Sequence, residues 1–436
     1  MTSGFQNIGR VPELQRRILF TFGMLAVYRL GAHIATPGID PQVIKSFFDQ
    51  MAGSVFGLFN LFSGGALEQL SIFALGIMPY ISASIIFQLL TIVIPSLEQL
   101  QKEGEQGRRK ITQWTRYATV VIALFQSTLL AIALEHGQFG EGAVAVPGWG
   151  FRLMVALTLT TGTAFIMWLG EQITERGIGN GISLVIFAGI IVRLPSALGT
   201  LWEQVRTDQF TVLGAIILLA FVVAFMGFVV LCERAQRRIP IQHARRVVGR
   251  KVMQGGMSYF PLRLNTAGVI PPIFASSILM FPMTITQFVD SPTISNFFSD
   301  YLHYGSVLYN GIYVALIIFF AFFYTAIVIN PTDVADNIKR SGAYIPGIRP
   351  GKRTAEYIDR ILGRLTLIGA IYVSVVCVMP VLLANQAGVP FYFGGTALLI
   401  VVGVALDTIG QIEAHLVSRQ YEGFVKGTRL RGRLGR

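Results

Sequence analysis

Apolar runs of membrane-spanning length recur along the whole chain, separated by short polar connections. A helix of about 20 residues crosses a hydrocarbon core about 30 Å thick, so we predict one spanning helix for each run. The fifth run is the weakest, because Arg193 and Pro195 interrupt it after a short apolar core. The ten predicted spans are residues 18–36, 73–94, 117–134, 153–170, 182–201, 212–232, 267–289, 307–329, 365–383 and 392–412.

Lysine and arginine are concentrated in alternate connections between these runs. One set of connections, which includes both ends of the sequence, holds 29 of the 35 basic residues, whereas the other set holds 4. Loops on the cytoplasmic side carry an excess of positive charge, so we predict that both termini are cytoplasmic. Without the fifth span the basic connection 233–265 would fall on the opposite side, and we keep that span for this reason.

Ten spans divide into two halves of five, residues 1–200 and 201–436. An odd number of spans in each half would give the halves opposite orientations, which is the layout of an inverted repeat. The sequence permits this layout, although no repeated string is evident by inspection. The expected fold class is therefore an all-α integral membrane protein with ten transmembrane helices.

The composition favours a membrane protein over a soluble one. Hydrophobic residues make up 53% of the chain and charged residues 13%, with a mean hydropathy of +0.60, whereas a soluble domain carries about 25% charged residues. The net charge of +12 does not indicate a nucleic-acid-binding domain, because the charges lie in connections between spans. Cys232 and Cys377 lie in apolar runs, and we interpret them as small packing residues.

The sequence lacks the residue patterns of catalysis, metal binding and ion coupling. The five histidines have no ligand spacing, and residues 347–352 resemble a phosphate-binding loop only until Arg353, which stands where Ser or Thr is needed. Ion-coupled transporters usually carry ionisable groups deep in the membrane, whereas Arg29 and Asp407 lie toward the ends of predicted spans and form no evident pair. We therefore predict a protein that is not an enzyme and that uses no cofactor or metal.

Two basic connections and one apolar segment are too long to be simple turns. The connections 233–265 and 330–360 hold eight and six basic residues; attraction to anionic lipid and docking of a macromolecular partner both explain them, and the residues alone leave both explanations open. Segment 37–72 is moderately apolar and rich in glycine. Non-helical backbone at membrane depth is tolerated only inside protein or a water-filled cavity, so we expect this segment to fold back into a cavity.

Several strings of residues closely resemble the SecY family, whose members form the central subunit of the bacterial protein-conducting channel. Long strings in a fixed order, from the first loop to the last span, are more specific than a short motif. They include SIFALGIMPYISASII at 71–86 and Gly-Ile-Arg-Pro-Gly at 347–351. The other strings are residues 61–67, 175–183, 265–277 and 394–402.

The resemblance implies a clamshell of ten helices in two inverted halves around an hourglass-shaped pore, in the bacterial cytoplasmic membrane. It also implies a non-enzymatic function, in which unfolded secretory polypeptides cross through the pore and hydrophobic segments leave it sideways into lipid. The implied partners are the small subunits SecE and SecG, the motor ATPase SecA, the ribosome, signal peptides and membrane lipid.

The family's pore ring and plug can be placed on this sequence by motif. A narrow ring of apolar side chains sheds water and so holds back ions, and isoleucine suits such a ring because its branched side chain is stiff. The resemblance places the ring at Ile77, Ile81, Ile182, Ile186, Ile273 and Ile400. It places the plug at about 60–72, within the segment expected to fill a cavity, and its residues include Leu61, Phe62, Ser63, Gly64, Gly65, Ala66 and Leu67.

The side exit and the docking loops are placed in the same way. Gln88, Gln126 and Asn265 match polar positions at the family's lateral gate, where interhelical hydrogen bonds worth about 0.6 kcal/mol each are weak enough to open. The two basic connections match the loops that dock SecA and the ribosome. The basic residues that match them are Arg245, Arg246, Arg250, Lys251, Arg349 and Lys352.

Two other classes of protein compete with the channel. A secondary transporter with an inverted repeat would need a coupling-ion site near the membrane midplane, and the spans carry no paired charges there. A lipid scramblase would explain the basic loops but not the isoleucine positions. Co-purification of a small membrane subunit with one or a few spans would favour the channel over both.

Overall fold

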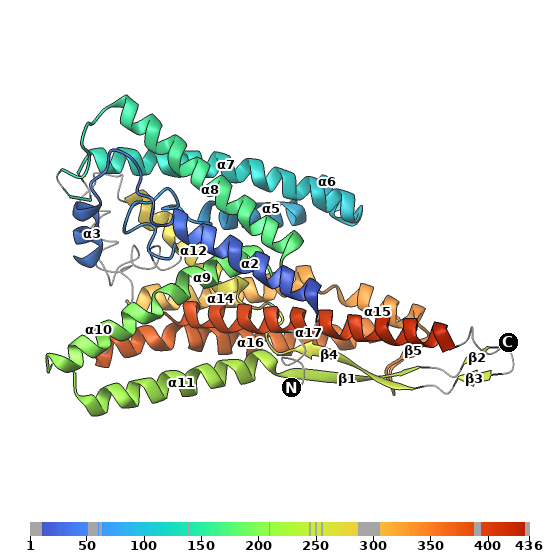
Figure 1. The fold of residues 1–436 in the computed structure, drawn as a ribbon. Helices are drawn as coiled ribbons and strands as arrows, with labels where there is room; N and C mark the ends of the chain where they lie inside the picture. Colours follow the sequence, from blue (N-terminus) through green and yellow to red (C-terminus); the bar gives the residue numbers. More distant parts are fainter. Residues whose placement is uncertain are drawn as a thin grey trace. The chain divides into compact units, whose positions relative to one another are not determined.

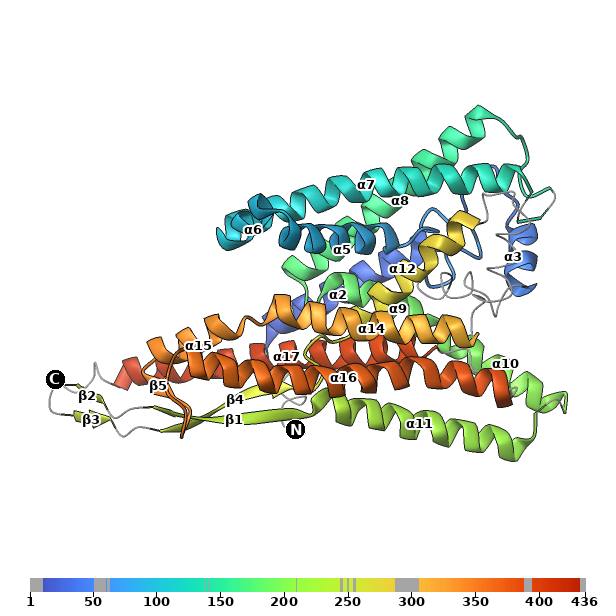
Figure 2. The ribbon, with the colours of Figure 1, turned by 180° about the vertical axis from the view of Figure 1, so that it is seen from behind.

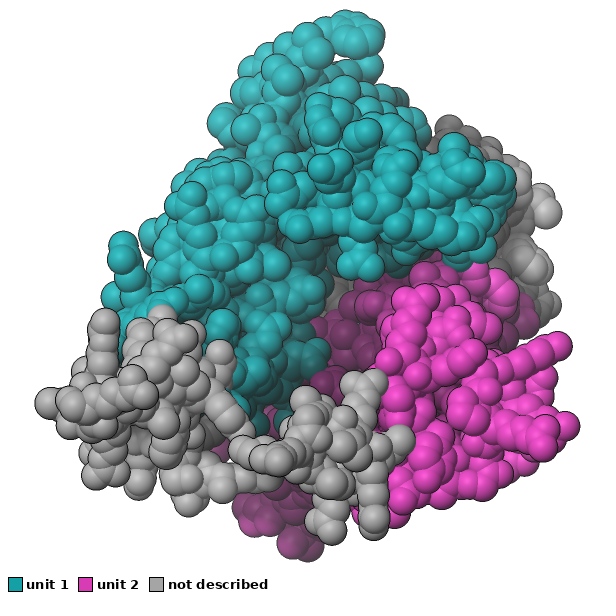
Figure 3. Space-filling view, turned by 90° about the vertical axis from the view of Figure 1, so that its right-hand side faces the viewer, with its two compact units in different colours: residues 1–200, 404–436 teal, residues 201–403 magenta. Residues whose placement is uncertain are grey.

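The structure is a computed structural model that describes residues 11–50, 60, 63–137, 139–140, 142–208, 210–243, 246–248, 251–253, 256–286, 306–387 and 394–431. Its membrane-spanning part is built from helices, and the strands lie in connections between them. The chain divides into two compact units, which Figure 3 colours separately. Unit 1 comprises residues 1–200 and 404–436, and unit 2 comprises residues 201–403.

Unit 1 is a bundle of helices in which α7 packs along α8 and α5, and α2 lies beside α8 and α9 (Figure 1). Two helices, α10 and α17, cross the boundaries between the units. The helices are α2 (Pro12–Gly31), α3 (Pro41–Gln50), α5 (Met78–Val93), α6 (Pro95–Lys102), α7 (Glu105–Glu135), α8 (Trp149–Arg176), α9 (Gly181–Val192), α10 (Leu194–Arg206) and α17 (Gly395–Arg431).

Unit 2 combines apolar helices with a basic β-hairpin that continues from the end of α11 (Figure 2). A three-stranded antiparallel sheet has the order β4-β1-β5, and β2 and β3 form a second, two-stranded sheet. The helices are α11 (Val212–Arg234), α12 (Ile270–Thr286), α14 (Val307–Val328), α15 (Pro331–Arg340) and α16 (Lys352–Ala387). The strands are β1 (Gln236–His243), β2 (Arg246–Val248), β3 (Lys251–Met253), β4 (Met257–Arg263) and β5 (Ala343–Tyr344).

Seven helical stretches in the described part of the chain are long and apolar enough to cross a membrane, so the protein is a multi-pass membrane protein. An eighth candidate is the pair α5 and α6, which is bent by 100°. The stretches are Glu105–Glu135, Trp149–Arg176, Gly181–Arg206, Val212–Arg234, Val307–Arg340, Lys352–Leu383 and Gly395–Val417. They coincide with seven of the ten predicted spans.

The first predicted span corresponds to α2, which has 20 residues but includes Arg16, Arg17 and Arg29. It is therefore less apolar than the seven stretches. The seventh predicted span corresponds to α12, whose apolar part is described as the shorter helix Ile270–Leu279. The count of ten spans stays a prediction.

The second predicted span begins later than the sequence pattern indicated. The prediction started it at residue 73, whereas residues 73–77 form turns and α5 begins at Met78. Gly76 has a φ of +56°, which a helix does not allow, and Pro79 lies in the first turn of α5, where its missing N–H costs no hydrogen bond. Hydropathy does not detect this boundary, since residues on both sides of it are apolar.

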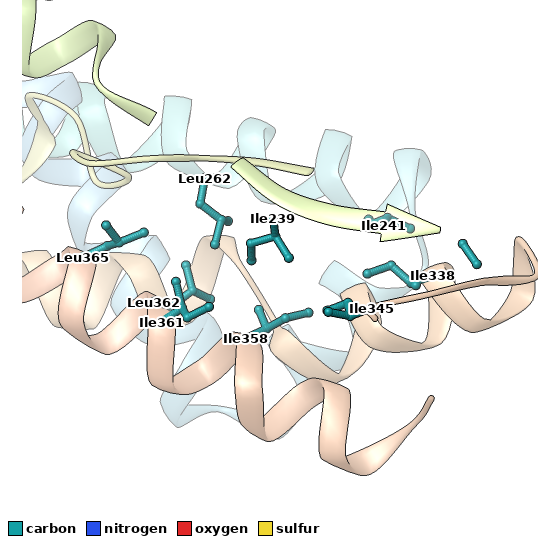
Figure 4. Close-up of a cluster of buried hydrophobic side chains, with 10 residues drawn as sticks. Ile239, Ile241, Leu262, Ile338, Ile345, Ile358, Ile361, Leu362 and Leu365 are labelled. Carbon is teal, nitrogen blue, oxygen red and sulfur yellow. The ribbon is translucent and has the colours of Figure 1, made fainter. Parts of the chain in front are cut away.

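The basic hairpin is fixed to the membrane part of unit 2 by a compact apolar cluster (Figure 4). Ile239 and Ile241 are buried on either side of the half-buried Pro240 in β1 and point to one face of the sheet, as the two-residue period of a strand requires. Ile338 from α15 and Ile358 from α16 complete the cluster, and Ile358 is fully buried. The hairpin, α15 and the start of α16 therefore form one packed platform.

Candidate functional site

Four of the six predicted ring residues lie in unit 1, on the first turns of two helices. Ile77 is the N-cap residue of α5, and its carbonyl accepts a hydrogen bond of 3.1 Å from the N–H of Ile81. Ile182 and Ile186 are likewise four residues apart, near the start of α9. Three of the four are buried, and Ile182 is half-buried.

The start of α9 is fixed by a close approach of two glycines. A Cβ added to Gly181 would lie 1.9 Å from the carbonyl oxygen of Gly170 in α8, so no other residue fits at position 181 without moving the backbone. The side chain of Asn180 caps the helix by accepting hydrogen bonds from the N–H groups of Ile182 and Ser183. These contacts fix the start of α9 against α8 and so fix the positions of Ile182 and Ile186.

The other two predicted ring residues lie in unit 2. Ile273 is half-buried in the first turn of α12, and Ile400 is 1% exposed near the start of α17. All six predicted ring residues therefore lie within the first two turns of a helix.

Residues 63–72 of the predicted plug segment are non-helical backbone, mostly buried, inside unit 1. Leu61 and Phe62 lie outside the described residues, whereas Asn60 and Ser63 to Ile72 are described. Ser71 N–H donates to the carbonyl of Ala66 at 2.8 Å, and Ser71 also forms a bridge with Ala35. Ala66, Leu70 and Ser71 are each at most 2% exposed. The described part of the segment thus has its own turns and packs inside unit 1.

Polar side chains from neighbouring helices hold this segment. Tyr28 Oη in α2 donates to the carbonyl of Ser63 at 3.1 Å, and Arg29 Nη1 donates to the carbonyl of Gly64 at 2.9 Å. Arg193 Nη2, at the end of α9, forms an ion pair of 2.7 Å with Glu68 Oε2. These plug contacts were not predicted, although Arg29 and Arg193 are isolated charges within predicted spans and so offered a signal.

The predicted gate amides differ in their surroundings. Asn265 is 6% exposed, and its Nδ2 donates to Glu233 Oε1 at 2.7 Å and to the carbonyl of Gly268 at 3.1 Å. Gln88 in α5 and Gln126 in α7 are half-buried. The hydrogen bonds described for the Asn265 side chain therefore stay within unit 2.

The described docking residues lie just before and at the start of α16 and on β2 and β3. Arg349 is exposed, and its carbonyl accepts a hydrogen bond of 2.9 Å from Thr354 Oγ1, which fixes the turn before α16. Lys352 is the exposed first residue of α16. Arg246 and Lys251 lie on β2 and β3, where only the backbone is described, and Arg245 and Arg250 lie outside the described residues.

The described residues contain no group of three or more His, Cys, Asp or Glu side chains that could hold a metal ion. The arrangement consists instead of apolar helix ends, a buried non-helical segment and a basic platform. Together with the apolar helices, these features define a multi-pass membrane protein.

Comparison with known proteins identifies the family. The family model for SecY matches residues 71–409. The chain is 51% identical to the protein translocase subunit SecY of Escherichia coli (strain K12), over 97% of this chain and 96% of that protein. It is 45% identical to the protein translocase subunit SecY of Aquifex aeolicus (strain VF5), over 98% of this chain and 100% of that protein. The chain therefore belongs to the SecY family of protein translocase subunits.

Solved structures of low sequence identity have the same fold. The chain described as "The structure of a protein conducting channel" matches with a TM-score of 0.63 and 19% identity, over 93% of each chain. Sec61 in the canine ribosome-channel complex from the endoplasmic reticulum matches with a TM-score of 0.60 and 16% identity, over 93% of each chain. The fold is thus that of the SecY and Sec61 proteins.

Proposed function

We propose that this translocase subunit forms the channel itself, in the bacterial cytoplasmic membrane. Unfolded secretory polypeptides cross through it, and hydrophobic segments leave it sideways into the lipid. One observation carries the proposal: residues 63–72 are non-helical backbone, mostly buried, inside a bundle of apolar helices. Such backbone is tolerated at membrane depth where it fills a cavity, and a plug in a closed channel fills one.

The proposed topology has ten transmembrane helices in two inverted halves, residues 1–200 and 201–436, with both termini in the cytoplasm. The predicted cytoplasmic connections hold 29 basic residues and the opposite connections hold 4, which supports this orientation. The helices α2 and α12 and the bent pair α5–α6 supply the three spans beyond the seven long apolar stretches. Five spans in each half give the halves opposite orientations.

The proposed pore ring consists of six isoleucines at helix ends. Its members are Ile77, Ile81, Ile182, Ile186, Ile273 and Ile400. A narrow passage lined by these side chains sheds water, so ions do not cross it at rest. The plug, residues 60–72, closes the external side of the passage. The ring and plug carry out no chemical reaction, and the role is that of a channel rather than of an enzyme.

The proposed lateral gate contains Gln88, Gln126 and Asn265. Hydrogen bonds between membrane helices contribute only about 0.6 kcal/mol each, so a signal peptide that inserts between the helices can replace them. The contact of Asn265 with Glu233 and Gly268 supports a role in fixing the start of α12, because Gly268 lies two residues before that helix. The gate then opens when α12 moves.

The proposed docking surface comprises Arg349 and Lys352, just before and at the start of α16, together with four basic residues of the 233–265 connection: Arg245, Arg246, Arg250 and Lys251. Its partners are SecA and the ribosome, and SecE and SecG complete the membrane complex. Arginine pairs in a fork geometry with carboxylate and with RNA phosphate, which suits both large partners. Structurally similar Sec61 and yeast Ssh1 complexes are bound to ribosomes, which supports the ribosome as one partner.

Deletion of residues 60–70 tests the proposed function. We expect a folded complex whose ion conductance in planar bilayers is higher than that of the wild-type complex reconstituted at equal density. The ring alone then separates the two sides, and it closes less tightly than ring and plug together. A conductance no higher than wild type would show that the segment does not plug a channel.

A further inference from the structure

Three polar residues on two neighbouring helices hold the plug segment in place. The helices α2 and α9 lie side by side (Figures 1 and 2). From α2, Tyr28 and Arg29 donate hydrogen bonds to two successive carbonyls of the segment, at 3.1 and 2.9 Å. From the end of α9, Arg193 pairs with Glu68 at 2.7 Å. Two arginines therefore fix the segment, one through its backbone and one through its carboxylate.

Glu68 also ties the segment to itself. Asn60 Nδ2 donates to the same oxygen, Glu68 Oε2, at 2.9 Å, and the Glu68 N–H donates to Asn60 Oδ1 at 3.1 Å. Asn60 is 4% exposed. One carboxylate oxygen thus receives a hydrogen bond from within the plug and another from the helix beside it, so the folded shape of the plug and its attachment depend on the same side chain.

Close backbone packing brings the segment within reach of Arg193. A Cβ added to Gly64 would lie 2.7 Å from Gly189 Cα in α9, and one added to Gly65 would lie 3.2 Å from Arg193 Nη2. Both glycines have positive φ angles, +66° and +86°. Because the segment presents no side chains here, its backbone lies against α9 and the guanidinium of Arg193 can span to Glu68.

We propose that Arg29, Arg193 and Glu68 form a polar latch that determines how readily the plug leaves its closed position. This inference rests on the proposed function, since it assumes that the segment is a plug. The Arg193 and Glu68 side chains are 28% and 24% exposed, so water is close enough to replace the pair when the plug moves. A charge-assisted hydrogen bond in such a site is stronger than a neutral one but breaks without leaving a fully buried charge.

The polar latch contrasts with apolar packing as a means of holding a plug. Apolar contacts resist release in proportion to the area exposed to water, and they do not depend on charge. The latch adds directional contacts to the segment's backbone, so it holds one closed position rather than a range of positions. Neutralising either partner of the ion pair is therefore expected to raise the frequency of opening without unfolding the helices.

Three variants test the polar latch: Glu68→Gln, Arg193→Gln and the double variant. Glutamine keeps the length of the side chain and its ability to hydrogen-bond, so the segment can still fold. The readouts are channel open probability in planar bilayers and export of a precursor with a defective signal sequence. We expect each single variant to raise the open probability about tenfold, and the double variant to match the singles rather than multiply them, because the three variants remove one interaction.

Glu135→Gln is the matched control. Glu135 pairs with Arg152 between the ends of α7 and α8, and this pair is as buried as the latch, with side chains 15% and 27% exposed. It does not touch the plug segment in the described contacts, so its loss is expected to leave open probability and export unchanged. Deletion of residues 60–70 serves as the reference for a channel without a plug.

The outcomes separate the latch from the proposed function. Wild-type open probability in Glu68→Gln and Arg193→Gln, together with a raised value in the deletion variant, would overturn the latch and leave the plug in place. An unchanged value in the deletion variant would overturn the plug itself. An equal rise in Glu135→Gln would show a general loss of stability instead of a latch. Effects of the two single variants that multiply in the double variant would show that Glu68 and Arg193 act independently, which would also overturn the latch.

Discussion

Gly64→Ala is expected to release the plug, because position 64 carries two separate constraints. Gly64 has a φ of +66°, and this left-handed conformation costs a residue with a Cβ about 1–2 kcal/mol. The new Cβ would also lie 2.7 Å from Gly189 Cα, a backbone atom that cannot rotate away. Overpacking of this kind costs about 1–3 kcal/mol.

Both costs apply only while the segment stays in its closed position against α9. Together they amount to about 2–5 kcal/mol, and since about 1.4 kcal/mol corresponds to a factor of ten, the ratio of released to closed plug should rise at least about 30-fold. The assay is ion conductance of the reconstituted complex in planar bilayers, which measures that ratio as leak through the ring.

Gly104→Ala is the control for backbone strain alone. Gly104 has a φ of +80° but no atom within 4 Å of an added Cβ, and it precedes α7 in a connection predicted to be cytoplasmic. This substitution therefore has a similar conformational cost without touching the plug, and wild-type conductance is expected. If Gly64→Ala conducts no more than Gly104→Ala while the complex remains folded, the reasoning about the close contact with Gly189 is wrong.

Three further predictions concern the gate and the docking platform. Asn265→Leu removes both hydrogen bonds of the Asn265 side chain and leaves an apolar seam. We expect this substitution to bias the gate toward the closed state and to reduce export. Better export of precursors with defective signal sequences would show that the substitution opens the gate instead. Arg349→Lys keeps the charge but loses the fork geometry, so SecA-driven transport should fall, and retained transport would argue against a geometric role. Ile358→Ala removes a fully buried side chain from the platform and should destabilise it by about 2–5 kcal/mol, seen as lower thermal stability and weaker partner binding. Ile368→Ala, at a position 53% exposed on the same helix, should change stability by less than about 0.5 kcal/mol.

The spans could be predicted from the sequence wherever hydropathy alone decides the structure. The runs at 212–232 and 307–329 match apolar helices almost residue for residue, because a membrane helix satisfies its own backbone and needs only apolar side chains. The interruption at Arg193 and Pro195 also matches the break between α9 and α10. The turns at 73–77 were missed, since their residues are as apolar as the helix that follows.

The contacts of the candidate site depend on residues that are distant in sequence. Glu68 and Arg193 are 125 residues apart, and a charge pattern along the chain does not reveal such a pair. The hairpin β1–β4 was not predicted for a different reason: the many charges of residues 233–265 indicate a surface loop, and only Ile239 and Ile241 show the alternation of a strand. The six ring isoleucines could be placed only by resemblance, because an isoleucine in a membrane helix is ordinarily a packing residue.

The central claim is that a translocating polypeptide passes through the ring of isoleucines. A photo-crosslinking residue placed at Ile186, which is 4% exposed, should form a crosslink with a precursor arrested during translocation. The same residue at Leu157, which is 63% exposed on α8, is the control and should form none. A crosslink at position 186 that depends on the arrested precursor is the predicted result, and equal or absent crosslinking at the two positions would contradict the account.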